Sequence, residues 1–150
     1  MAVKTEKTAS GDVRRKPVAI SARGAELQLP PQHDRAIREI RDLGTLAPNW
    51  DSYGAASVQG GAQARAIAFM ATLATHDGTS LPAPSVSASP DGGVLLRWNS
   101  AETDVMLTFL PDGGEYSVVD KQTDEVIAEG SIGRPEGLVR DVMPHLQAAA

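Results

Sequence analysis

The stretch that decides the fold is "SPDGGVLLRWNSAETDVMLTFLPDGGEYSVVD", from Ser89 to Asp120. Apolar and polar residues alternate in short runs within it, and this period of two is typical of strands with one buried face. Turn-forming residues separate the runs about every ten positions, as in antiparallel sheets. In both "PDGG" turns proline fixes φ, aspartate caps its own backbone and glycine supplies a positive φ. The stretch therefore predicts an antiparallel β-meander.

Runs with strand character also flank this stretch, at "SVSAS" (85–89) and "EVIAEG" (125–130). They extend the prediction to a meander of about four to five strands. In up-and-down order both "PDGG" turns lie at one end of the sheet, where Asp91 and Asp112 approach each other. Calcium sites usually recruit about six or more oxygen ligands, so we interpret both aspartates as turn residues and expect no metal site.

One face of the predicted sheet is apolar. An antiparallel sheet with one polar face needs apolar cover only on the other, and helices that precede the sheet in the sequence can supply it. The side chains expected on the covered face are Val94, Leu96, Trp98, Val105, Leu107, Phe109, Tyr116 and Val118.

Two helices are predicted before the sheet. In "HDRAIREIRDLGTL" (33–46) Ile37, Ile40 and Leu43 recur at three-residue steps, which is the pattern of an amphipathic helix. A second helix is expected to start after an N-cap at Ser57. Its apolar stripe comprises Ala62, Ala66, Phe69 and Leu73.

A third helix is predicted in "RPEGLVRDVMPHLQAAA" (134–150), which spaces apolar residues by four at Leu138, Val142 and Leu146. Pro144 interrupts this segment, because an interior proline removes a hydrogen bond and clashes with the carbonyl four residues back. We therefore expect a short helix that kinks or ends near Met143.

These elements predict one α+β domain at residues 32–147, with two N-terminal helices packed on one face of the meander and a short C-terminal helix. Residues 1–31 mix Lys, Thr, Ser, Gly and Ala without an apolar period and end in "LPP", so they are expected to form a flexible basic leader. Residues 148–150 are expected to be a disordered tail.

Charge is unevenly distributed along the 150 residues. Residues 1–30 carry six Lys or Arg against three Asp or Glu, whereas the remaining 120 carry eight against sixteen. The body of the chain, residues 31–150, is therefore acidic and repels phosphate backbones. We do not expect nucleic acid as its partner. The basic run "VRRKP" (13–17) leaves open a nucleic-acid tether through the leader.

The composition also points to a compartment. The chain has no cysteine, so it has neither a disulfide framework nor a thiolate metal site. Its longest apolar run, "AIAFMATLA" (66–74), is far shorter than the roughly 20 residues that cross a bilayer. We expect a cytoplasmic protein without a membrane segment.

Catalytic signatures are scarce. "HD" occurs at His33–Asp34 and at His76–Asp77, but a histidine-aspartate metal site needs more ligands, set on several helices. No glycine-rich phosphate loop is present, and the sixteen acids after residue 30 make any particular carboxylate pair uninformative. We expect no catalytic residue and no cofactor, although a small hydrolase with a carboxylate or His-Asp site stays an alternative.

The segment "LAPNWDSYGA" (46–55) concentrates aromatic residues in a loop, since it holds one of two tryptophans and one of two tyrosines. Trp50 can fold back and plug the open end between the helices and the sheet. Alternatively, Trp50, Asp51 and Tyr53 form a contact surface, because Trp and Tyr are enriched among binding hot spots. We name these three residues as the candidate binding site.

"NWDSYGA" (49–55) and the helix predicted after it, together with "PSVSASPDGGVLLRW" (84–98) and "VMLTFLPDGGEYSVVD" (105–120), resemble an uncharacterised bacterial protein family. Its members carry an "NWDGYGA"-type motif followed by a "dGG…leW" strand. Here Ser52 stands where the family often has glycine, and Arg97 where it often has glutamate. The resemblance covers about residues 35 to 120. It implies one domain and no catalytic residue.

The acidic body, the basic leader and the scarcity of catalytic signatures together favour a non-enzymatic protein-binding or regulatory module. By analogy, small acidic α+β proteins with basic partners include antitoxins, immunity proteins and secretion chaperones. The expected partner is another protein, and the charge of the body favours a basic one.

Overall fold

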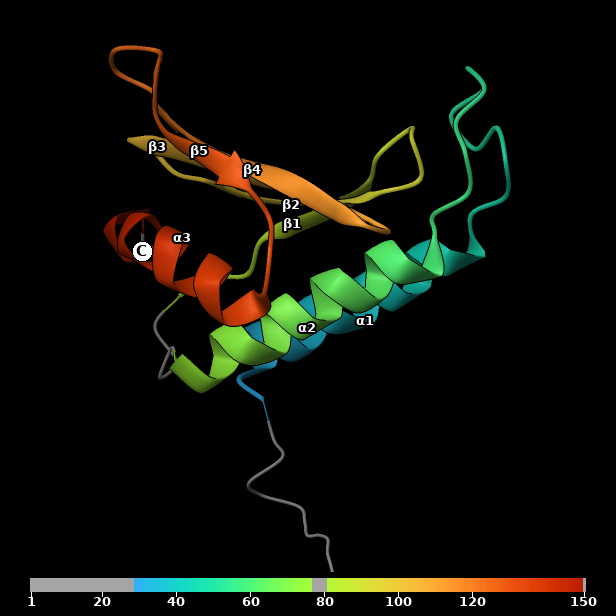
Figure 1. The fold of residues 1–150 in the computed structure, drawn as a ribbon, viewed down its shortest axis with the longest axis horizontal. Coiled ribbons are helices and arrows are strands. Elements are labelled where there is room, and N and C mark those ends of the chain that lie inside the picture. Colours follow the sequence, from blue (N-terminus) through green and yellow to red (C-terminus); the bar gives the residue numbers. More distant parts are fainter. Residues whose placement is uncertain (1–28, 77–80, 150) are drawn as a thin grey trace, which may run out of the picture.

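Three α-helices lie against one face of a five-stranded antiparallel sheet (Figure 1) in the computed structural model, which describes residues 29–76 and 81–149. The α+β prediction is confirmed. In chain order the elements are α1 (Pro31–Asp42), a 3-10 turn η2 (Leu43–Thr45), α2 (Gly60–His76), β1 (Ser85–Ala88), β2 (Val94–Asn99), β3 (Thr103–Leu110), β4 (Gly113–Asp120), β5 (Glu125–Ser131) and α3 (Pro135–Ala149). No helix in these described ranges combines the length and apolarity needed to cross a bilayer.

The sheet is an up-and-down meander, with the spatial order β1-β2-β3-β4-β5. Val94 of β2 pairs with Phe109 of β3, which in turn pairs with Gly114 of β4, so both "PDGG" turns lie at the same end of the sheet as predicted. The face toward the helices is apolar because alternate residues point to it. Its predicted side chains are buried, apart from Tyr116, which is half-buried.

Helix α2 forms the centre of the cover. Its predicted apolar stripe is completely buried, and the ring of Phe69 lies between two aromatic rings of the sheet. The centroid of Phe69 is 6.2 Å from that of Trp98 in an edge-on arrangement and 5.8 Å from that of Phe109. Aromatic pairs at these separations add to the energy of burial, so Phe69 joins the two layers.

Helix α2 starts at Gly60, two residues later than the Ser57 cap predicts. The preceding segment instead pairs with the first "PDGG" turn. Ala56 N–H donates to the Pro90 carbonyl at 2.9 Å, and Gln59 N–H donates to the Gly92 carbonyl at 2.9 Å. The backbone there is therefore not helical, and the Gln59 carbonyl accepts the first helical hydrogen bond, from Gln63 N–H.

Helix α3 is not the short helix that was predicted, because it is 15 residues long and does not end near Met143 but continues through Pro144 to Ala149. Pro144 is exposed, whereas Val142 and Leu146 on the other side of the helix are fully buried. Burying a leucine contributes about 1.5–3 kcal/mol, which offsets the hydrogen bond that proline removes. α3 contacts α2, β2 and β3, so three helices and not two cover the sheet.

The predicted leader falls almost entirely outside the described residues, which begin at Leu29. Pro31 occupies the first turn of α1, where the missing N–H of proline costs little.

Candidate functional site

The motifs of the family resemblance meet at one end of the molecule. A protruding loop, residues 46–59, rises beyond the end of α1 and α2 beside the β1–β2 turn (Figure 1). The first "PDGG" turn accepts the two backbone hydrogen bonds of this loop described above. The second turn is tied to α2, because Arg65 Nε donates to the Pro111 carbonyl at 3.0 Å. Both turns therefore serve as anchors for the segment that carries the loop.

Side chains of the loop fix its backbone. One carboxylate oxygen of Asp51 accepts hydrogen bonds from Tyr53 N–H at 2.8 Å and Ala55 N–H at 3.1 Å. The side-chain oxygen of Asn49 accepts one from Gly54 N–H at 2.7 Å, and Asn49 N–H donates to the Ala55 carbonyl at 2.6 Å. These bonds hold left-handed conformations at Asn49 (φ 65°) and Gly54 (φ 88°), which asparagine and glycine tolerate best.

Trp50 braces the loop from inside. Its indole Nε1–H donates to the Ala56 carbonyl at 2.9 Å, and its side chain is half-buried. The ring lies outside the hydrophobic core cluster that the described helices and strands form. Trp50 therefore closes the loop upon itself and does not plug the end of the core.

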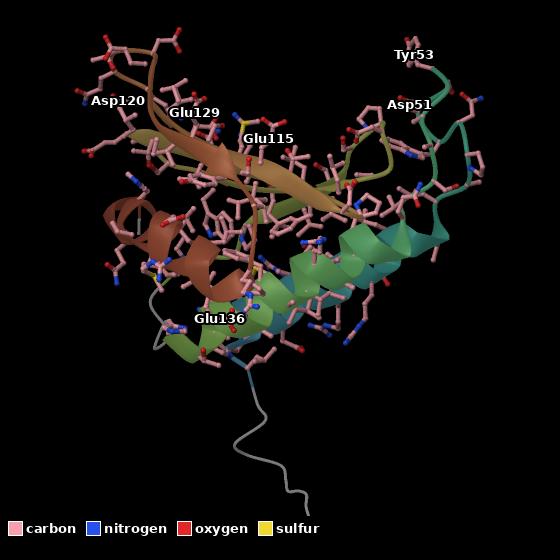
Figure 2. The ribbon with its side chains drawn as sticks, in the orientation of Figure 1. Asp51, Tyr53, Glu115, Asp120, Glu129 and Glu136 are labelled. Atoms are coloured by element: carbon pink, nitrogen blue, oxygen red, sulfur yellow. The ribbon has the colours of Figure 1, made fainter. Side chains whose placement is uncertain are left out.

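Tyr53 is placed in the opposite way. It lies at the outer tip of the loop and points away from the domain (Figure 2), with 92% of its surface exposed. The two aromatics that the sequence places three residues apart thus have different environments: Trp50 holds the loop and Tyr53 is presented by it. Asp51 lies between them, half-buried, and its carboxylate is engaged by the loop backbone.

Asp51 is therefore a positioning residue. In Asp51→Ala both backbone donors lose their acceptor, which costs about 1 kcal/mol locally. We expect the amide hydrogens of Tyr53 and Ala55 to exchange about fivefold faster by NMR, with little change in the exchange of the sheet. Asp51→Asn is the matched control, since its amide oxygen still accepts. Equal exchange in the alanine variant and the wild type would contradict this role.

The His-Asp pairs do not meet. His33 is fully buried in the first turn of α1, and Asp34 pairs with Arg38 on the surface of that helix. His76 is exposed at the end of α2, where its Nδ1–H donates to the Thr72 carbonyl at 2.9 Å, and Asp77 lies outside the described residues. Within the described ranges, no group of three His, Cys, Asp or Glu is arranged to hold a metal ion.

Arg97, which departs from the family pattern, pairs with Asp104 across β2 and β3. Two hydrogen bonds of 2.8 and 2.7 Å join the guanidinium to the carboxylate. The hydrogen bond and the charge of Asp104 raise the pKa of Arg97 above its ordinary value. An arginine whose pKa is raised by folding stabilises the fold at every pH below its ordinary pKa, which is far above neutrality. This shift therefore produces no pH dependence of stability near neutrality. The arrangement is a surface ion pair, with no sign of acid-base chemistry.

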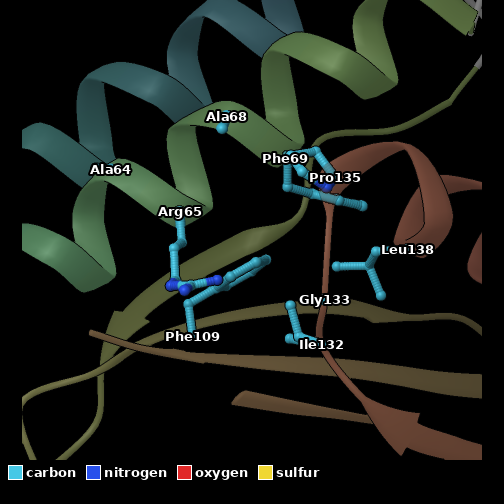
Figure 3. A pocket seen from close by; sticks show the side chains of 9 residues that line it. All are labelled: Ala64, Arg65, Ala68, Phe69, Phe109, Ile132, Gly133, Pro135 and Leu138. Atoms are coloured by element: carbon cyan, nitrogen blue, oxygen red, sulfur yellow. The ribbon is translucent and has the colours of Figure 1, made fainter. Parts of the chain in front are cut away.

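Sequence patterns missed an apolar pocket of about 250 Å³ between α2, β3 and the β5–α3 connection. Phe69 lines it from α2 and Phe109 from β3, and Leu138 and Ile132 lie on the side toward α3 (Figure 3). Arg65 extends from α2 along the other side. Because these residues come from four separate elements, no local pattern signals the pocket.

The chain matches no protein-family model, and no curated protein or solved structure is significantly similar to it. The family resemblance accordingly stays a prediction, and the functional argument depends on geometry alone.

Proposed function

We propose that this domain is a non-enzymatic protein-binding module whose contact residue is Tyr53. The observation that carries the proposal is the nearly complete exposure of this tyrosine on a loop whose backbone is fixed by side-chain hydrogen bonds. The other aromatics are used for structure, since Phe69, Phe109 and Trp98 are buried. A chain that is only 4% aromatic leaves one ring entirely in solvent.

Physical chemistry favours such a residue as a hot spot. Tyr is enriched among residues that dominate binding energy, because it brings a large contact area with few rotatable bonds. A loop that is already ordered also loses less conformational entropy when it binds. Trp50 and Asp51 contribute indirectly here, by holding the loop in the conformation that presents Tyr53.

The charge of the body favours a basic protein as the partner. Glu115 and Glu129 lie on the face of the sheet that the helices leave uncovered (Figure 2). Like-signed charges on one side of a protein attract an oppositely charged partner over a distance and accelerate the encounter. The analogy with antitoxins, immunity proteins and secretion chaperones belongs to this proposal, and so do the cytoplasmic location and bacterial type.

The test compares partner capture by the wild type, Tyr53→Ala and Tyr53→Phe from lysate of the native host. Tyr53→Ala is expected to leave the free energy of unfolding within about 0.5 kcal/mol of the wild type, because the side chain is exposed. It is expected to lose at least about tenfold in affinity for the stoichiometric partner, whereas the ring-retaining Tyr53→Phe keeps most of it.

Equal recovery of each protein by the wild type and Tyr53→Ala would contradict the assignment of Tyr53. Failure of every variant to retain a stoichiometric protein would contradict the binding module itself.

A further inference from the structure

The pocket between α2, β3 and the β5–α3 connection has the composition of a small-ligand site. Its lining is almost entirely apolar, with Phe69, Phe109 and Leu138 among the buried residues behind it, and the pocket opens to solvent. Ligand pockets in proteins are typically apolar concavities in which a few polar groups fix the orientation of the ligand. One charged group lines this pocket, the guanidinium of Arg65.

Arg65 is held in place but its charge is not neutralised. Its Nε–H donates to the Pro111 carbonyl at 3.0 Å, which orients the guanidinium, and the side chain is half-buried. Within the described residues Arg65 forms no ion pair, although acids outnumber bases two to one after residue 30. A guanidinium whose terminal N–H groups are available beside an apolar cavity is suited to a carboxylate.

The volume limits the apolar part of the ligand. An apolar cavity of about 150 Å³ accommodates benzene, so about 250 Å³ accommodates one ring and a short arm. Typical drug-sized ligands occupy pockets of about 300 Å³ or more. The occupant is therefore smaller than a drug-sized molecule or a folded peptide segment.

We propose that this pocket binds a small monocarboxylate with an apolar body of about one ring. The body contacts the apolar lining at Ala68, Ile132 and Pro135, and the carboxylate accepts hydrogen bonds from the terminal N–H groups of Arg65. Figure 3 shows these groups facing a common space, with Ile132 and Gly133 on the side opposite Arg65. This site is separate from the Tyr53 loop, so the proposal does not depend on the proposed protein contact.

Titration with phenylacetate, followed by NMR, tests the proposal, with phenylacetamide as the neutral probe of the same shape. Phenylacetate is expected to shift the methyl resonances of Ile132 and Leu138 saturably. Arg65→Gln is expected to lower the affinity for phenylacetate at least about tenfold and to leave the affinity for phenylacetamide unchanged. Only the charged probe is bound by the guanidinium.

Two variants that fill the pocket from opposite sides provide the steric control. Ala68→Leu adds volume from α2. Gly133→Val adds it from the β5–α3 connection, where a new Cβ has no neighbour within 4 Å. Both variants are expected to lower the affinities for phenylacetate and phenylacetamide equally.

Three results would overturn the proposal. The pocket is not the site if phenylacetate causes no saturable shift of the methyl resonances in the wild type. The same holds if it causes the same shift in Ala68→Leu and Gly133→Val as in the wild type. If phenylacetamide binds the wild type as tightly as phenylacetate, Arg65 does not select a carboxylate and the proposed ligand class is wrong.

Discussion

Gly114→Ala is expected to destabilise the domain by at least about 3 kcal/mol, because two separate penalties act at this position. Gly114 has φ +143°, a conformation that L side chains rarely adopt. In addition, a Cβ built on it lies 2.0 Å from the Thr108 carbonyl oxygen and 3.2 Å from Ile132 Cδ1. The first contact is with backbone, so it is relieved only by moving β4 away from β3.

Urea denaturation measures this effect as a lower midpoint. Small domains have a total stability of about 5–15 kcal/mol, so such a loss removes a large fraction of it. Gly113→Ala is the matched control in the same turn: its Cβ has no neighbour within 4 Å, so we expect a change below about 0.5 kcal/mol. Similar midpoints for the two variants would show that the turn adapts and that the second "PDGG" is a less demanding anchor than the geometry indicates.

Phe69→Ala is expected to cost about 3–5 kcal/mol, the range for deleting a buried aromatic side chain. Phe69 has no exposed surface and is in ring contact with Trp98 and Phe109, so its removal leaves a cavity between the helical layer and the sheet. Alanine favours the helix intrinsically, so the loss arises from packing and not from helix propensity.

Tyr53→Ala removes an aromatic ring that is exposed. Comparing the two variants therefore separates the effect of burial from the effect of losing an aromatic ring. We expect urea denaturation to shift strongly for Phe69→Ala and hardly at all for Tyr53→Ala, with unchanged m-values. A loss below about 1 kcal/mol for Phe69→Ala would mean that the surrounding side chains close the cavity.

Local patterns predicted much of this fold. Alternation predicted about four to five strands and the buried face of the second, third and fourth, and the short turns predicted the meander. The first two helices followed from the apolar spacing. Both errors arose where a local penalty or preference was outweighed by a distant contact. Ser57 does not cap α2, because the segment around it hydrogen-bonds to the first "PDGG" turn, and Pro144 does not end α3, because Leu146 is buried beyond it.

The candidate site was less predictable. The side chains of Asn49 and Asp51 hydrogen-bond to the backbone of their own loop, and these contacts are local because they span at most five residues. Which of the two loop aromatics is exposed depended on the path of the loop, which is set by its anchoring to the β1–β2 turn. The pocket beside Arg65 was invisible because its lining residues come together only when α2, β3 and α3 pack.

The sequence by itself determined the secondary structure, the apolar face of the sheet and the positions of both "PDGG" turns. These features depend on periodicity and on residue preferences within a few neighbouring residues. Tertiary structure alone decided where α2 begins, how far α3 extends, which aromatic reaches solvent and which cation lies beside an apolar cavity. Each of those outcomes depends on which surface of a distant element covers a residue. The free energy gained by burying the residue against that surface is absent until the layers pack.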